Sequence, residues 1–102
     1  MFGKMGDMMG KLKEMKRMSD EIKQKLDDTI LTVDGAGGDI KISINGNREL
    51  KSLTIASALQ HGNKEELEEQ LLATLNKALF KANEVNENEM KKVAGSMLPG
   101  LG

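Results

Sequence analysis

Apolar residues recur in alternating steps of three and four along the first quarter of the chain. The series is Met5, Met8, Leu12, Met15, Ile22 and Leu26, with Ser19 at the intervening position. This heptad spacing predicts a helix of about five or six turns that begins after the glycine-rich start and ends near Asp27 or Asp28. Gly10 weakens it by about 1 kcal/mol relative to alanine.

The middle of the chain changes to an alternating pattern rich in β-branched residues, which is typical of strands. The three stretches are TILTVD (29–34), DIKISIN (39–45) and LKSLTIAS (50–57). In the second stretch three isoleucines alternate with Lys41 and Ser43, so one face of the sheet is apolar and the other faces solvent. The order of the stretches predicts a three-stranded antiparallel meander.

Glycines cluster in the segment GAGG, residues 35–38. A phosphate-binding loop ends in Lys and Ser or Thr and leads into a helix, whereas Asp39 and a strand follow here. We therefore interpret GAGG as a hairpin loop in which glycines supply positive φ angles. Asn45-Gly46 predicts a second hairpin, of type I′.

A second long helix is predicted after the loop QHGN, because Asn63 and Glu66 have the spacing of a capping box. Its apolar face comprises Leu67, Leu71, Leu72, Leu75, Ala78, Leu79, Ala82 and Val85, and the helix could extend to Val93. The fold class is thus α+β: a helix, the meander and a long C-terminal helix. We expect one domain over residues 1–95 and a loosely ordered tail over 96–102.

Composition adds a limit on the core. The chain of 102 residues has two Phe, no Trp, no Tyr and eight Met, so its apolar core must be small. A homodimer would enlarge the core and cover a sheet edge. The absence of cysteine and of a recognisable leader favours a cytoplasmic protein, and no apolar run is long enough to span a membrane.

Charge is unevenly distributed although the formal net charge is only −1. Residues 1–26 hold seven basic side chains against four acidic ones, whereas acid gathers in Glu65, Glu66, Glu68 and Glu69. Lysines and no acids occupy the positions that flank the heptad seam, so two such helices would repel each other in parallel, and the seam should face the other helix, the sheet or a negatively charged partner. Charge alone leaves three alternatives: a solvated face, a nucleic-acid surface or a membrane surface.

Candidate catalytic groups are few. His61 is the only histidine and lies in a polar loop, which favours an exposed residue over a metal ligand or general base. No serine has the Gly-x-Ser-x-Gly setting, and the glutamates of the second helix suit its N-terminus as a solvated face. We therefore predict no enzyme, no metal, no cofactor and no small-molecule substrate.

Four segments together resemble a known bacterial family. They are MFGKMG at the start, GAGGDIKISINGNRELKSLTI (35–55), LLATLNKAL (71–79) and MKKVAGSMLPGL (90–101). Their order and spacing resemble the YbaB/EbfC family of nucleoid-associated proteins over nearly the whole chain. The most specific parts are Gly-Gly-x-x-Lys-x-x-x-Asn-Gly and the pair Asn76 and Ala78. One departure is IASALQHG (55–62), which replaces a turn resembling Asp-Pro.

The resemblance implies a cytoplasmic, nucleoid-associated homodimer. Its protomers would join through their sheets and project helices that bind duplex DNA with little sequence preference, with links to nucleoid organisation and gene regulation. The family supplies no compact contact motif, so charge and helical position select the expected phosphate contacts. These are Lys11, Lys13, Lys16, Arg17, Lys23 and Lys25 in the first helix, with Lys77, Lys81, Lys91 and Lys92 in the second.

An alternative function belongs to a different class. The methionine-rich first helix could dock into the apolar groove of another protein, which would make the chain a protein–protein adaptor. This hypothesis suits the nearly neutral net charge better than DNA binding does.

Overall fold

The computed structural model describes residues 2–97, with side chains described from residue 8 to residue 95. In chain order, a small sheet lies between two long helices. The elements are α1 (Phe2–Asp28), β1 (Ile30–Gly35), the 3₁₀ turn η1 (Ala36–Gly38), β2 (Ile40–Asn45), β3 (Leu50–Ile55), the short helix α2 (Ser57–Gln60) and α3 (Lys64–Met97). This order confirms the predicted α+β fold.

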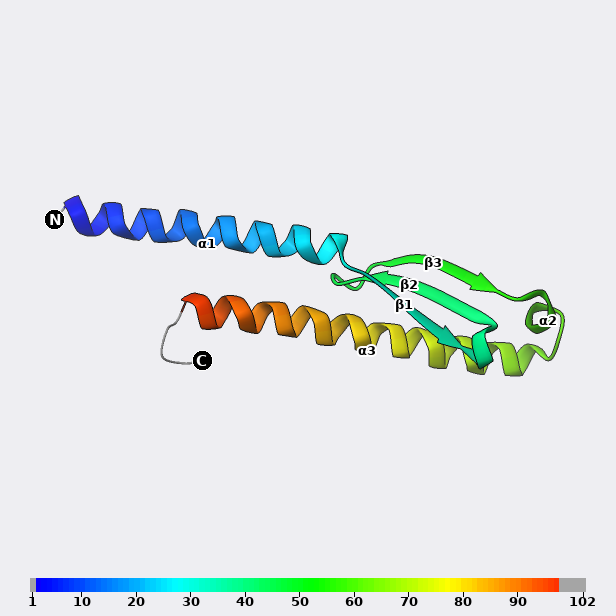
Figure 1. The fold of residues 1–102 in the computed structure, drawn as a ribbon. Coiled ribbons are helices and arrows are strands. Elements are labelled where there is room, and N and C mark those ends of the chain that lie inside the picture. Colours follow the sequence, from blue (N-terminus) through cyan, green and yellow to red (C-terminus); the bar gives the residue numbers. More distant parts are fainter. Residues whose placement is uncertain (1, 98–102) are drawn as a thin grey trace.

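The chain is a rod with extents of 71 × 23 × 16 Å (Figure 1). The N-terminal half of α3 lies along the sheet, against β1 and β2. Its C-terminal half continues beyond the sheet and lies beside α1, which leaves the sheet in the same direction. A compact domain of this length has a radius of gyration of about 13 Å, whereas this chain has 20.0 Å. Much of each long helix therefore has few neighbours within the chain.

The sheet is antiparallel in the order β1-β2-β3, as the meander requires. Opposite residues share a face, so the pairs Val33 with Ile42 and Ile42 with Leu53 define the apolar face. The core forms where α3 covers this face, and Ala78 and Ala82 pack there against Val33 and the three isoleucines of β2. The predicted division into an apolar and a solvent face is confirmed.

Small residues let α3 approach the sheet closely. At Gly35 a Cβ atom would lie 1.8 Å from Oγ1 of Thr74, so no side chain fits there. Thr74 is itself buried, and its hydroxyl donates to the carbonyl of Gln70 at 2.7 Å. Gly35 is thus explained by the approach of a helix.

Residues 36–38 of the GAGG segment form the predicted loop, with positive φ angles at Gly37 (67°), Gly38 (99°) and also Ala36 (52°), whereas Gly35 ends β1 with an extended backbone. The type I′ prediction for Asn45-Gly46 is wrong. Positive φ falls instead on Arg48 (65°), after a turn closed by a 3.0 Å hydrogen bond from the amide of Arg48 to the carbonyl of Asn45. This is the pattern of a three-residue hairpin loop. Gly46 is required there because a Cβ would lie 2.7 Å from Leu26 Cδ2.

The helices are longer than predicted. Helix α1 begins at Phe2, since the first turns contain neither proline nor a β-branched residue to stop propagation. Helix α3 extends through Met97, which includes the first two residues of the expected tail; residues 98–102 lie outside the described part. The third strand ends at Ile55, and the unpredicted helix α2 follows, packing Leu59 against the core.

Candidate nucleic-acid interface

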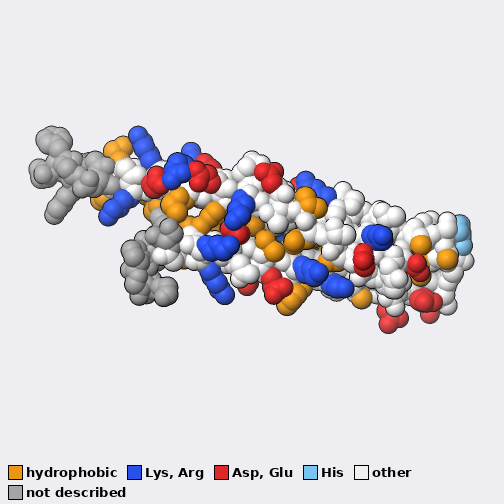
Figure 2. Space-filling view, viewed as in Figure 1, with side chains coloured by type: hydrophobic (Ala, Val, Ile, Leu, Met, Phe, Trp, Pro, Cys, Tyr) orange, Lys and Arg blue, Asp and Glu red, His pale blue; other side chains and the backbone are white. Residues whose placement is uncertain are grey.

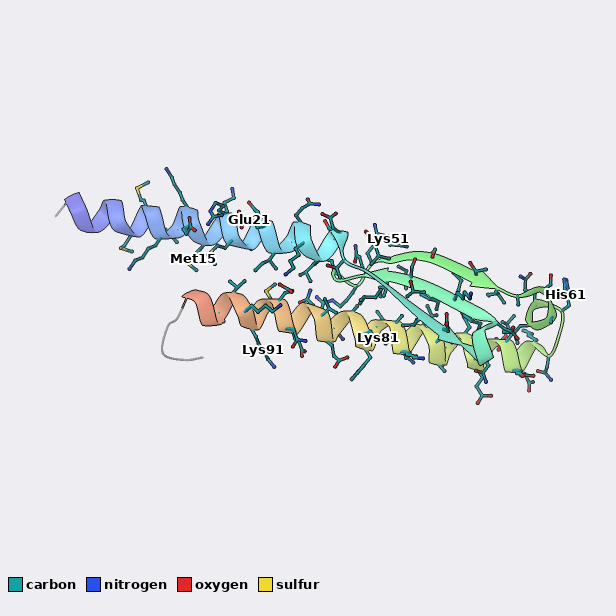
Figure 3. All side chains as sticks on the ribbon, viewed as in Figure 1. Met15, Glu21, Lys51, His61, Lys81 and Lys91 are labelled. Carbon is teal, nitrogen blue, oxygen red and sulfur yellow. The ribbon has the colours of Figure 1, made fainter. Side chains whose placement is uncertain are left out.

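Part of α1 projects as an arm, defined here as the part of the helix from Phe2 to Lys23. At its base Leu26 is only 1% exposed, and Ile22 is half-buried. Farther out, Met8 is 65% exposed, Leu12 62% and Met15 46%. Met15 points toward α3 whereas Glu21 points away (Figure 3). The predicted heptad seam therefore packs within the chain only at its C-terminal end.

The cations predicted to contact phosphates are all exposed, but they are not equally available. Arg17 bonds to both Glu14 and Glu21, each one turn away on the outer side of α1. Its hydrogen bonds hold the pKa of the Glu14 carboxyl below its usual range, and Glu14 raises the pKa of Arg17 in turn. A phosphate would have to compete with these carboxylates, so Arg17 is a poor candidate for a phosphate contact.

Glu89 joins the two long helices through cations from each. Its Oε1 lies 3.0 Å from Nζ of Lys25 in α1 and 3.3 Å from Nζ of Lys92 in α3. The Glu89 side chain is 13% exposed, and the hydrogen bond from Lys25 lowers the pKa of its carboxyl. Lys77 is also engaged, because it donates to the carbonyl of Asp34 at 3.1 Å.

The remaining predicted cations make no ion pair with another described side chain. They are Lys11, Lys13, Lys16 and Lys23 in α1 and Lys81 and Lys91 in α3. Lys81 and Lys91 lie on the side of α3 away from α1 (Figure 3). Lys and Arg side chains alternate with Asp and Glu along α1 on the face seen in Figure 2. One chain thus brings Lys25 and Lys92 together but does not gather all ten cations.

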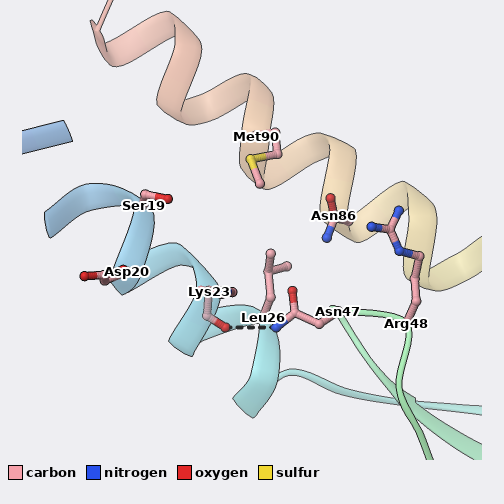
Figure 4. A pocket seen from close by; sticks show the side chains of 8 residues that line it. All are labelled: Ser19, Asp20, Lys23, Leu26, Asn47, Arg48, Asn86 and Met90. Atoms are coloured by element: carbon pink, nitrogen blue, oxygen red, sulfur yellow. Dashed lines mark hydrogen bonds between the residues drawn. The ribbon is translucent and has the colours of Figure 1, made fainter. Parts of the chain in front are cut away.

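A crevice of about 230 Å³ separates the base of α1 from α3 (Figure 4). Its lining comprises Ser19, Asp20, Lys23, Leu26, Asn47, Arg48, Asn86 and Met90. Arg48 is a cation close to both helices that the sequence prediction did not include. The Asn-Gly signal at 45–46 could have placed Arg48 at a hairpin tip, but only the fold shows that this tip lies between α1 and α3.

Besides the exposed apolar side chains of the arm, a second apolar surface lies at β3, the outer strand of the sheet. Helix α3 covers β1 and β2, so Leu50 and Leu53 of β3 remain exposed on the same face. They line a shallow groove of about 270 Å³ with Leu75 of α3. Leu72 and Leu79 are also exposed and follow the same side of the helix as Leu75. We call these five leucines the leucine surface.

Groups suited to catalysis are not assembled in the described part of the chain. No cluster of three or more His, Asp and Glu side chains there could hold a metal ion. His61 is exposed at the end of the molecule opposite the α1 arm (Figure 3). Among residues 2–97 no helix is long and apolar enough to cross a membrane. The features that do stand out are an exposed helical arm that carries lysines and an apolar surface of leucines.

Comparison with known proteins places this arrangement in a family. The model of the YbaB/EbfC DNA-binding family matches residues 1–97, and the chain belongs to that family. This confirms the family to which the four sequence segments pointed. The family is one of DNA-binding proteins and not of enzymes, in agreement with the prediction from the sequence.

Relatives agree over most of their length. A nucleoid-associated protein of Flavobacterium johnsoniae is 40% identical over 94 residues, which cover 92% of this chain and 88% of that protein. A nucleoid-associated protein of Ruminiclostridium cellulolyticum is 31% identical over 102 residues, which cover 97% of this chain and 89% of that protein. The crystal structure of an uncharacterized protein from Helicobacter pylori matches with a TM-score of 0.81 at 31% identity, over 86% of this chain and 94% of that one.

Proposed function

We propose that the protein is a nucleoid-associated homodimer that binds duplex DNA through phosphate contacts, with little sequence preference. The observation that carries this proposal is the α1 arm, an exposed helix with lysines along it, in a chain of the YbaB/EbfC DNA-binding family. Two named nucleoid-associated relatives support the same location. Binding of this kind would influence nucleoid organisation and gene expression.

A second copy of the chain is the proposed partner of the leucine surface. Leu72 is 63% exposed and Leu53 51%, and neither has an apolar neighbour that covers it from outside. The chain buries few large apolar side chains, because its core comprises mainly β2 and two alanines of α3. Pairing two leucine surfaces would extend this core and protect the edge of β3. The two α1 arms would then project from one joined body.

Dimerisation has a direct test with a matched control. Leu53→Glu puts a charge into the leucine surface and should give a monomer in sedimentation experiments, whereas the unchanged chain gives a dimer. Ile30→Glu is the control, because Ile30 is equally exposed but lies on the solvent face of the sheet. A dimer that survives Leu53→Glu and dissociates with Ile30→Glu would place the interface on the other face.

Phosphate contacts are expected from lysines that have no carboxylate partner. Lys16 and Lys23 lie two helical turns apart on one side of α1, so both can face the same duplex. The sequence shows no zinc finger, no recognition helix pattern and no aromatic platform for stacking single strands. Contacts to the sugar-phosphate backbone therefore account for the binding, and these carry no direct sequence information.

Charge reversal tests the arm. Lys16→Glu and Lys23→Glu should each weaken binding to unrelated duplexes to the same degree, measured by mobility shift. Lys64→Glu is the matched control, because Lys64 is exposed at the far end of α3. Equal binding by all three variants and the unchanged protein would place the DNA contacts elsewhere.

A second candidate function is favoured by the exposure of Met8, Leu12 and Met15. This apolar strip on the arm could dock into another protein, as the adaptor hypothesis requires. Salt distinguishes the two functions, because apolar docking tolerates 200 mM salt whereas phosphate contacts weaken strongly. Leu12→Gln with Met15→Gln should abolish adaptor binding and leave phosphate contacts in place.

A further inference from the structure

The tip of the β2–β3 hairpin, residues 45–48, contacts both long helices. On the α1 side, the amide of Gly46 donates to the carbonyl of Leu26 at 2.9 Å. The side-chain amide of Asn47 donates to the carbonyl of Lys23 at 3.1 Å, shown as the dashed line in Figure 4, and also to the carboxylate of Asp27. The hairpin tip therefore binds the last two turns of α1.

The same tip is bonded to α3. The side-chain amide of Asn86 donates to the carbonyl of Gly46 at 3.1 Å. The guanidinium of Arg48 donates to Oδ1 of Asn83 at 2.9 Å. Asn83 and Asn86 are almost one turn apart in α3, so the hairpin tip is held at two points of this helix.

The hairpin tip is also bonded internally. Oδ1 of the buried Asn45 accepts hydrogen bonds from the amides of Asn47 at 3.0 Å and Glu49 at 2.9 Å. Leu26 closes the contact with α1, because it packs against Gly46 where no Cβ fits. An internally bonded element that contacts two helices restrains the angle between them.

The direct ion pair between α1 and α3 is partly exposed to solvent. The described ion pair between them joins Glu89 to Lys25, whose side chain is mostly exposed, so water and salt screen this pair. The crevice of about 230 Å³ shows that the helices are not tightly packed beside the hairpin tip. We propose that Asn47 and Asn86 are positioning residues: through the hairpin tip they hold the α1 arm at a fixed angle to α3.

This inference rests on the proposed function where DNA is concerned. A phosphate-binding arm must be in the right place before it contacts a duplex, and the apparent affinity falls with the fraction of molecules that are competent. If each arm of a dimer holds its angle for about one third of the time, both do so for about one ninth, and affinity falls about tenfold.

The arm angle can be measured without DNA. The chain has no cysteine, so Met9→Cys in the arm and Glu84→Cys in α3 provide unique sites for spin labels. Labelled chains are diluted with unlabelled chains to isolate distances within one protomer, and double electron-electron resonance gives the distance distribution. We expect a narrow distribution for the unchanged protein and a clearly broader one for Asn47→Ala with Asn86→Ala.

A matched variant separates positioning from stability. Asn63→Ala removes the cap of α3, whose Oδ1 accepts from the amide of Glu66 at 3.0 Å, and lies far from the arm. It should lower thermal stability and leave the label distance unchanged. An unaltered distribution in the Asn47→Ala, Asn86→Ala protein would overturn the proposal, as would equal broadening by Asn63→Ala.

A rescue experiment links the angle to DNA. A short bifunctional thiol reagent between Lys25→Cys and Glu89→Cys should restore binding to the Asn47→Ala, Asn86→Ala protein. The reference is the same cross-linked protein with both asparagines intact. Failure of the rescue would contradict the positioning role. If the unchanged protein binds no DNA, the proposed function fails, and the label distances still decide the inference about the hairpin tip.

Discussion

The sheet with α3 and the α1 arm differ in where their apolar side chains lie. The isoleucines of β2 are buried between the sheet and α3, whereas the methionines and Leu12 of the arm are open to solvent. The sheet region obtains its stability from contacts within one chain. The arm gains little from tertiary packing, which for α1 is concentrated at Leu26 below the arm, so the arm surface is available to a partner.

The two regions also differ in whether their cations have partners within the chain. Three cations near the sheet and the base of the arm already have partners, since Lys25 and Lys92 pair with Glu89 and Lys77 donates to a backbone carbonyl. Lysines of the arm have no carboxylate partner among the described side chains, whereas Arg17 bonds to Glu14 and Glu21. Residues that build the fold and residues that bind DNA are therefore expected to be separable by mutation.

Truncation of an apolar residue should give the largest contrast. Ile42→Ala leaves a cavity under α3 and should lower the free energy of unfolding by about 3 kcal/mol. Leu12→Ala in the arm should change it by no more than about 0.5 kcal/mol. Urea titrations followed by circular dichroism, at one protein concentration, measure both. A large loss for Leu12→Ala would show that the arm is packed in solution.

A methyl group added at the hairpin tip should have an intermediate effect. In Gly46→Ala the new Cβ would be 2.7 Å from Leu26 Cδ2 and 3.0 Å from the Leu26 carbonyl oxygen. Because the backbone oxygen cannot move away freely, we expect a loss of about 1 to 3 kcal/mol in the free energy of unfolding. The same urea titration measures it. Unchanged stability would mean that α1 does not dock on the hairpin as described.

A glycine-to-alanine change in the arm should have the opposite effect on the free energy of unfolding. At Gly10 no atom lies within 4 Å of an added Cβ, and the residue is in a helix. Gly10→Ala should therefore raise the free energy of unfolding by about 0.5 to 1 kcal/mol and increase the helical signal in circular dichroism. A loss of stability would indicate that a partner chain approaches the arm at Gly10.

The smallest expected effect is on the pH dependence of stability, through Glu89 at the contact between α1 and α3. The pKa of Glu89 is lowered from 4.5, so the folded state binds its proton less readily than the unfolded chain does. The stabilisation is complete above pH 4.5 and is lost as the pH falls through the lowered value. Glu89→Gln should therefore reduce the loss of stability between pH 6 and pH 3, measured by thermal unfolding. An identical acid dependence in both proteins would show that Glu89 makes no ion pair in solution.

The sequence was sufficient for those features of the fold that depend on local chemistry. Alternating β-branched residues predicted the three strands, and Asn63 with Glu66 predicted the start of α3, where the hydrogen bond is present. Gly37 and Gly38 of GAGG were correctly assigned to a loop with positive φ. Each of these features is set by neighbours within a few residues in the chain.

Features that depend on distant residues could not be predicted. Gly46 looked like a turn residue, yet it is needed because Leu26 packs against it from the end of α1. Arg48 was overlooked because only the fold brings it beside α3. The weakness of Arg17 as a candidate site could have been found, since Glu14 and Glu21 lie three and four residues away. The ten cations themselves remain a prediction.

The salt dependence of binding tests the central claim most directly, that phosphates are held by lysines of the projecting arms. Affinity for a random-sequence duplex would be measured by fluorescence anisotropy over a series of salt concentrations. If a dimer engages six phosphates, the slope of log K against log salt is about −5, and Lys16→Glu with Lys23→Glu makes it shallower. A slope near zero, or the same slope in both proteins, would contradict the account.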